Sequence, residues 1–179
     1  INENEIQNTI SKDYPIYLSN GNYAEQNPED WYRQSMLAMK ELLRDVDKSE
    51  VKAIGFCGQM HGLVMLDEQG EVIRPSIIWC DQRSSSQTKE MLDLLPMEKW
   101  MEISANPPIA GWTAAKILWV RENKPEVYQK CRHILLPKDY IRFILTGEFA
   151  TDVSDASGMQ ILDVKNRCWS DELLGVLEF

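Results

Sequence analysis

The segment Gly58–Gly62 carries side chains that are suited to binding a polyhydroxylated ligand. It follows the apolar run Val51–Cys57, which predicts a buried strand, and ligand sites in α/β proteins favour such strand ends. The amide of Gln59 and the ring nitrogens of a neutral His61 can each donate and accept hydrogen bonds. On the residues alone, a simpler alternative is favoured, in which Met60 fills a gap in the core and His61 is a turn residue.

A second candidate segment is Ile77–Arg83, where another apolar run ends in polar residues. Trp79 could pack against the apolar face of a sugar, and the carboxylate of Asp81 could accept hydrogen bonds from hydroxyl groups. The alternative is equally open: Asp81 would cap the helix that follows, and Trp79 would belong to the core.

Two further segments complete the candidates. The stretch Gly111–Asn123, with Thr113 as helix cap, predicts a packing helix with a charged outer face that includes Lys116. The stretch Thr151–Gly158 gathers three hydroxyl groups and two carboxylates, which could bind a sugar or a cation. Such residues more often form turns through side-chain-to-backbone hydrogen bonds.

Several function classes lack support in this chain. It contains no G-x-x-x-x-G-K-[ST] or G-x-G-x-x-G phosphate loop, no G-x-S-x-G nucleophile motif and no histidine pair at metal-ligand spacing, so we predict no metal site. The formal net charge of −9 argues against a nucleic-acid partner. No apolar run approaches the roughly 18 residues of a membrane span.

The periodicity predicts elements that would position these residues. Residues 14–18, 51–57, 76–80 and 133–136 are expected to be strands, and residues 63–73 a hairpin around Glu68-Gln69-Gly70. A helix should begin at Asn27-Pro28 and bury one face with Tyr32, Met36, Met39, Leu43 and Val46. Further helices are expected at 82–94, 97–103, 113–122, 125–131, from Pro137 to Gly147, and at 170–178.

The expected fold is an α/β domain with a mixed sheet flanked by helices. Four widely spaced cysteines, Cys57, Cys80, Cys131 and Cys168, favour reduced core thiols over disulfides. Together with the absence of a signal peptide, they predict a cytoplasmic location.

Several segments together resemble the FGGY family of carbohydrate kinases. The stretch Gly111–Asn123 fits that family's first signature pattern at every constrained position. Gly58–Gly62 is similar to the sugar loop of the xylulose-phosphorylating members, whereas the glycerol-phosphorylating members have an Arg-Glu pair in place of Met60-His61. Four further segments are similar too: Tyr23–Trp31, Leu135–Tyr140, Thr146–Glu148 and Ser154–Gly158. The resemblance thus extends over essentially the whole chain.

The resemblance implies a ribonuclease-H-like, actin-like ATPase fold and a set of sugar contacts. Met60 and His61 match positions that contact the ketose, with Gln59 adjacent to them. Trp79 matches an aromatic residue that lines the sugar site of related glycerol kinases. Trp112 and Asp155 lie in matching loops, and with Asp81 they complete the substrate-binding candidates.

The resemblance also implies a longer enzyme, of which residues 1–179 would form part of the N-terminal domain. ATP and Mg²⁺ would be its cofactors and D-xylulose its substrate, giving D-xylulose 5-phosphate; ribulose, gluconate or a related polyol are alternatives. The phosphate loop, the catalytic Asp and the C-terminal nucleotide domain would lie outside this chain, so we expect it to be inactive by itself. Its uncovered sheet edge would favour self-association, for example as a homodimer. A less favoured alternative is a non-catalytic sugar-binding module.

Overall fold

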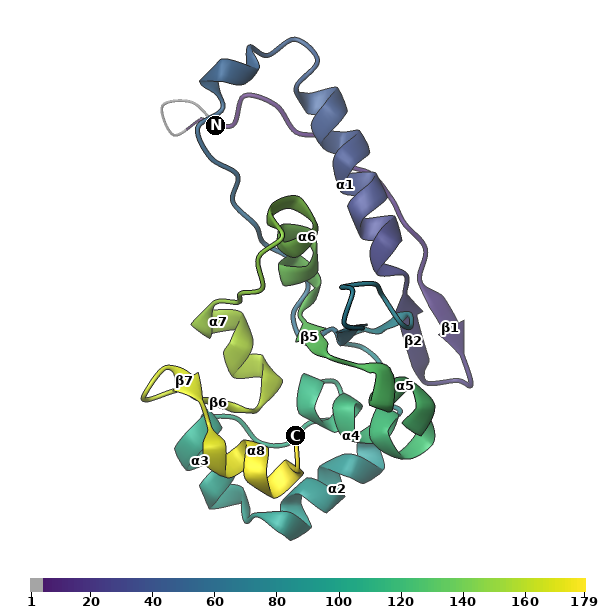
Figure 1. The fold of residues 1–179 in the computed structure, drawn as a ribbon, viewed down its shortest axis with the longest axis vertical. Coiled ribbons are helices and arrows are strands. Elements are labelled where there is room, and N and C mark those ends of the chain that lie inside the picture. The colour runs from purple at the N-terminus through teal and green to yellow at the C-terminus, as the bar shows by residue number, and fades with distance from the viewer. Residues whose placement is uncertain (1–4) are drawn as a thin grey trace.

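The computed structural model describes residues 5–179 as a chain of short helices and short strands (Figure 1). The helices are α1 (Pro28–Leu42), α2 (Ser85–Leu94), α3 (Met97–Ser104), α4 (Thr113–Asn123), α5 (Pro125–Lys130), α6 (Pro137–Thr146), α7 (Val153–Ala156) and α8 (Asp171–Leu177), with short 3-10 helices η1 (Lys48–Glu50) and η2 (Ser157–Met159). The strands are β1 (Tyr17–Ser19), β2 (Tyr23–Gln26), β3 (Val64–Leu66), β4 (Ser76–Ile77), β5 (His133–Leu135), β6 (Leu162–Asp163) and β7 (Cys168–Trp169).

The predicted start of the first long helix is confirmed. Pro28 is the first residue of α1, and the side chain of Asn27 accepts a hydrogen bond from the backbone N–H of Glu29 at 3.1 Å. Proline loses no helical hydrogen bond at this position, and the asparagine oxygen satisfies one of the unpaired N–H groups of the first turn. Local side-chain chemistry therefore determines this boundary.

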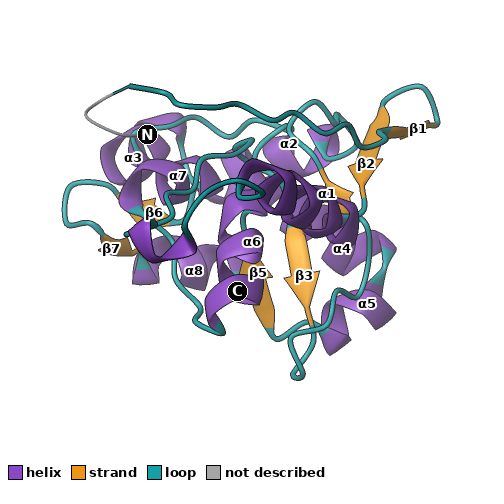
Figure 2. Cartoon of the chain, turned by 90° about the horizontal axis from the view of Figure 1, so that it is seen from above, coloured by secondary structure: helices purple, strands orange, loops and turns teal. Residues whose placement is uncertain are grey.

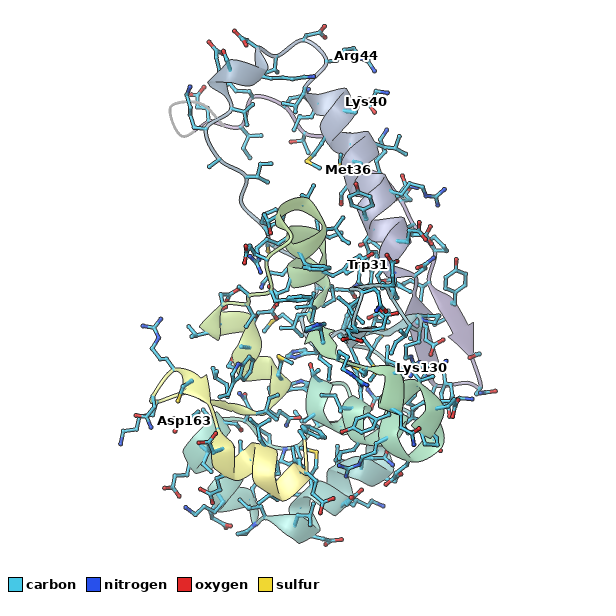
Figure 3. All side chains as sticks on the ribbon, in the orientation of Figure 1. Trp31, Met36, Lys40, Arg44, Lys130 and Asp163 are labelled. Carbon is cyan, nitrogen blue, oxygen red and sulfur yellow. The ribbon has the colours of Figure 1, made fainter. Side chains whose placement is uncertain are left out.

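The predicted buried face of this helix is largely wrong. Within α1 only Pro28 and Trp31 are buried, while Met36 is exposed and Val46 lies beyond the end of the helix and is exposed as well. Helix α1 projects away from the other helices, so that Trp31 lies where α1 meets them and Met36 lies further out (Figures 1 and 3). An amphipathic pattern buries its apolar stripe only where another element covers it.

The predicted strand over residues 51–57 is also wrong. This segment has no regular secondary structure and is mostly exposed, and it runs from η1 back toward α6 (Figure 1). A strand requires a neighbouring backbone to accept and donate its hydrogen bonds, and within residues 5–179 no segment pairs with this one. The strand expected at 14–18 forms later, as β1, and is exposed.

All strand pairs among the described residues are antiparallel, and they form three small sheets, β1-β2-β4, β3-β5 and β6-β7, instead of one mixed sheet. The predicted hairpin is confirmed, because Leu66 bridges Val72 across the Glu68-Gln69-Gly70 turn. The predicted strands at 76–80 and 133–136 form as the shorter β4 and β5. The helices expected after residue 82 are all present, and α6 ends at Gly147 with φ of 75°.

The β3-β5 pair lies between α6 and α4 (Figure 2). Successive side chains of β3 point to opposite faces, so Val64 and Leu66 pack with Tyr140 of α6 while Met65 packs with Ile117 of α4. Helix α4 also contributes Ala114, Ala115 and Leu118 to a second core cluster with α2, α3 and α8. It is thus a central helix.

Two smaller predictions about burial are corrected by this arrangement. Residues Thr113–Val120 of α4 are all buried, including Lys116, so the expected charged outer face is absent over those two turns. The cysteines are free but are not core thiols: Cys57, Cys80 and Cys168 are exposed and Cys131 is half-buried. Within the described part of the chain, no helix is long and apolar enough to span a membrane.

Candidate functional site

His61 occupies an unusual backbone conformation in the loop before β3. Its φ is 64°, in the left-handed region that side chains other than glycine rarely adopt. Its carbonyl oxygen points toward α4, where it accepts hydrogen bonds from Lys116 Nζ at 2.6 Å and from Thr113 Oγ1 at 3.4 Å. The backbone turn is therefore held by side chains more than fifty residues away in sequence.

The imidazole of His61 is oriented by two contacts. It stacks on the indole of Trp112, with ring centroids 4.5 Å apart and planes 7° from parallel. Its Nδ1 lies 3.2 Å from the carbonyl oxygen of Gly158. A carbonyl only accepts hydrogen bonds, so Nδ1 carries the proton in this contact and Nε2 of the neutral ring is left as an acceptor.

The surroundings of His61 favour that neutral form. Burial lowers the pKa of the imidazole, and the positive charge of Lys116 lowers it further. The hydrogen bond with Gly158 acts to raise this pKa but does not outweigh the burial. A neutral imidazole with a free Nε2 can accept a hydrogen bond from a sugar hydroxyl. The simpler alternative for this loop, a core-filling Met60, is wrong, because 42% of that side chain is exposed.

Trp79 presents an open aromatic surface near this loop. Its side chain is 56% exposed, so it is not the core residue of the alternative interpretation. The backbone carbonyl of Trp79 packs against Gly111, where a Cβ would lie only 2.5 Å from the carbonyl oxygen. The Trp79 backbone therefore lies beside Gly111, the neighbour of Trp112, and Trp112 in turn stacks on His61, which follows Met60.

Gln59 is half-buried at the edge of this region. Its amide Nε2 donates to Oε1 of Gln26 at 2.7 Å, and the same oxygen accepts from Trp31 Nε1 at 3.1 Å. Part of the hydrogen-bonding capacity of Gln59 is thus used to tie the loop to β2.

The hydrogen bonds and ion pairs of Asp81 do not include His61. Asp81 is fully buried. Its carboxylate accepts a hydrogen bond from the backbone N–H of Ala24 at 2.5 Å and another from Arg83 Nη2 at 2.7 Å. Nor does Asp81 cap α2, whose N-cap residue is Ser84. Arg83 pairs with both Asp81 and Glu25, so the geometry indicates a structural role for Asp81.

Asp155 lies in α7, just before the Gly158 carbonyl that contacts His61. Its side chain is buried, and Lys138 Nζ lies 3.3 Å from Oδ2, close enough for Coulombic attraction although neither carboxylate oxygen has a hydrogen-bond partner. Burial raises the pKa of Asp155 despite that attraction. Lys138 also pairs with Asp139 at 2.6 Å and Asp152 at 2.7 Å. Burial alone would lower the pKa of Lys138, but these hydrogen bonds outweigh it and raise that pKa.

The turns expected in the Thr151–Gly158 segment are present as well. Asp152 accepts hydrogen bonds from the backbone N–H groups of Ser154 and Asp155, both at 3.0 Å, and so caps α7. The segment therefore contains both a carboxylate that caps a turn, Asp152, and a buried carboxylate that pairs with Lys138 without a hydrogen-bond partner, Asp155.

Sequence reasoning missed Lys116 and Gly158 as parts of this site. The expected charged outer face of the helix includes Lys116, although this lysine lies within the run Ala-Ala-Lys-Ile-Leu, where its neighbours are small or apolar. That context was the available signal that the lysine is buried. The role of Gly158 depends on a contact with His61 that crosses 97 residues and leaves no local signature.

Known proteins resemble the chain over nearly its whole length. The family described as "FGGY family of carbohydrate kinases, N-terminal domain" matches residues 2–179. The xylulose kinase of Escherichia coli (strain K12) is 41% identical over 166 residues, which are 93% of this chain and 33% of that protein. The xylulose kinase of Bacillus subtilis (strain 168) is 38% identical over 176 residues, 97% of this chain and 35% of that protein.

Solved structures show the same fold. A ligand-bound xylulose kinase and a gluconate kinase, both from Lactobacillus acidophilus, each superpose with a TM-score of 0.88 at 28% identity, over 95% of this chain and 34% of theirs. The expected class, an α/β domain of the actin-like ATPase type, is thereby confirmed. The chain belongs to the FGGY family of carbohydrate kinases. It spans about a third of the length of the curated relatives that it matches.

Proposed function

We propose that this chain is the sugar-binding part of an ATP-dependent kinase that converts D-xylulose to D-xylulose 5-phosphate. Two observations support the substrate. The relatives that match most of the chain at 38% and 41% identity are xylulose kinases. The neutral His61, with Nδ1 held by Gly158, has an acceptor nitrogen for a sugar hydroxyl, and this single geometric feature carries the proposal.

The other candidates fit around that hydrogen bond. The exposed side chains of Met60 and Trp79 would cover the C–H face of the sugar, since aromatic and thioether groups pack well on apolar surface. Asp155 would accept a hydroxyl hydrogen bond with a carboxylate that has no hydrogen-bond partner in the described residues. In this scheme the chain binds and orients the ketose so that one hydroxyl faces the phosphoryl donor.

The chemistry of phosphoryl transfer would come from elsewhere in the protein. Residues 5–179 contain no group of three or more His, Cys, Asp or Glu side chains arranged to hold a metal ion. They do not fit Mg²⁺, and the sequence contains no phosphate-cradling glycine motif for ATP. We therefore propose that other parts of a longer enzyme bind ATP and Mg²⁺ and contribute the catalytic base. In this proposal residues 5–179 contribute no catalytic residue.

A histidine substitution in the complete protein tests the proposal. His61→Ala should raise the KM for D-xylulose about 10-fold, the value of one good hydrogen bond, while the KM for ATP changes less than about twofold. His133→Ala is the matched control, because His133 is also partly buried and stacked on an aromatic ring, that of Phe149, but lies in β5. Equal effects of the two variants on the sugar KM would contradict the proposed role of His61.

A second candidate substrate is gluconate. The gluconate kinase of Lactobacillus acidophilus superposes on this chain as well as the xylulose kinase of the same organism does, with a TM-score of 0.88 for each. The fold therefore does not distinguish a ketose from a sugar acid. Measuring kcat/KM of the complete protein with D-xylulose, ribulose, gluconate and glycerol decides between them: a preference for gluconate would replace D-xylulose in the proposal.

A further inference from the structure

We propose that Lys116 is a positioning residue of the sugar site, holding the His61 carbonyl and thereby the left-handed turn that aims the imidazole. This inference rests on the proposed function for its consequence in catalysis. The contact that carries it is the hydrogen bond from Lys116 Nζ to the carbonyl oxygen of His61, at 2.6 Å.

The complete burial of Lys116 indicates that its amine has a specific hydrogen-bonding role. The side chain is fully buried in α4, beside Ala115 and Ile117, which are also buried. Lysine is rarely fully buried without a partner, because removing an ammonium group from water is costly. A methionine or leucine would fill the same volume without that cost. Lys116 instead delivers a strong donor to one backbone oxygen.

The backbone of His61 shows what that donor does. With φ at 64°, the peptide carbonyl is directed into the protein, and the side chain is placed between Trp112 and Gly158. This conformation is strained for a residue with a Cβ and persists only where its surroundings hold it. Thr113 Oγ1, at 3.4 Å from the same oxygen, is a weaker second donor. Lys116 is therefore the principal restraint on the turn from the side of α4.

The hydrogen bond from Lys116 to His61 does not depend on the charge of the lysine. Burial of the amine lowers its pKa to about 7, although the charges of Asp81 and Cys80 act to raise that pKa. Both the ammonium group and the neutral amine carry N–H donors. The hydrogen bond to His61 is therefore available in either protonation state.

A double-mutant cycle in the complete protein tests whether Lys116 acts through His61. Lys116→Met should raise the sugar KM about 10-fold and change the ATP KM less than about twofold. In the His61→Ala background the same substitution should change the sugar KM less than about twofold, because the group that it positions is gone. Additive effects of the two substitutions, or equal changes in both KM values, would overturn the proposal.

Two controls make the result specific. Lys99→Met removes a lysine whose ion pair with Glu102 lies on the surface, and it should leave both KM values unchanged. If Lys116→Met does not yield folded protein, the cycle uses Lys116→Gln, which keeps an N–H donor on a shorter side chain. The Lys116→Gln variant should have a sugar KM between those of the parent protein and His61→Ala.

A readout independent of activity separates this inference from the proposed function. The ¹⁵N shifts of the His61 ring should show a single tautomer protonated at Nδ1 in the parent protein and a mixture in Lys116→Met. A complete protein that phosphorylates no sugar but shows this change would refute the proposed function and support the positioning role. An unchanged tautomer, in an enzyme that does phosphorylate D-xylulose, would overturn the positioning role alone.

Discussion

The imidazole of His61 lies flat on the indole of Trp112, with ring centroids 4.5 Å apart and planes 7° from parallel. The two residues come from different segments, a loop before β3 and the residue that precedes α4. Together with the carbonyl of Gly158, the indole leaves the ring one orientation. The acceptor nitrogen of His61 is thus positioned by three segments that are distant in sequence.

Removing the indole should loosen this arrangement. We expect Trp112→Ala to raise the KM for the sugar about 3- to 10-fold, the value of one aromatic pair, with little change in the KM for ATP. Trp112→Phe keeps a ring under the imidazole and should change the sugar KM less than about twofold. Steady-state kinetics of both variants check the prediction, which is wrong if phenylalanine and alanine have equal effects.

A methyl group at Gly158 should push the imidazole out of place. A Cβ at this position would lie 2.5 Å from Cε1 and Nδ1 of His61, far closer than van der Waals contact allows. We expect Gly158→Ala to weaken sugar binding about 10-fold or more, because the ring must leave the Gly158 carbonyl. Isothermal titration of the complete protein with the sugar measures this loss.

Gly175 provides the matched control. It lies in α8, and a Cβ there would meet no atom within 4 Å. Gly175→Ala should leave sugar affinity unchanged and stabilise the protein by about 0.5–1 kcal/mol, since alanine is the better helix former. If this variant weakened sugar binding as much as Gly158→Ala, the steric explanation would fail.

Asp81 should prove to be a stabilising residue. Because its carboxylate is buried against Arg83, we expect Asp81→Asn to destabilise the fold by about 3–5 kcal/mol and to leave the sugar KM of the folded enzyme unchanged. Glu102→Gln, which disrupts the exposed pair with Lys99, should leave the stability nearly unchanged, because solvent screens such a pair. Urea unfolding compares the two. A raised sugar KM with unchanged stability would instead support Asp81 as a sugar ligand.

The stability of the protein should depend on pH through Lys116. Burial lowers its pKa from 10.5 to about 7, so between these values the unfolded chain binds a proton that the folded protein does not. Raising the pH through this window therefore stabilises the fold, by at most about 1.4 kcal/mol per pH unit. The difference in unfolding free energy between the parent protein and Lys116→Met should follow this slope up to about pH 9 and be flat below pH 7. A difference independent of pH would show that Lys116 keeps an ordinary pKa.

Local chemistry explains which elements could be predicted. The Asn27-Pro28 start of α1, the turn at Glu68-Gln69-Gly70 and the end of α6 at Gly147 all depend on residues within a few positions of each other. The strand expected at residues 51–57 and the buried face of α1 failed because each needs a second element to cover it. Periodicity shows that a face is apolar, but another segment must be present to bury it.

The sequence by itself determined the family, most helix positions and the loop Gln59-Met60-His61 as the candidate sugar site. Only the tertiary structure decided how that loop is held. It buried Asp81 in an ion pair with Arg83, and it buried Lys116 against the carbonyl of His61, 55 residues away. Such contacts are formed by segments that meet only when the chain packs, so no local spacing could reveal them.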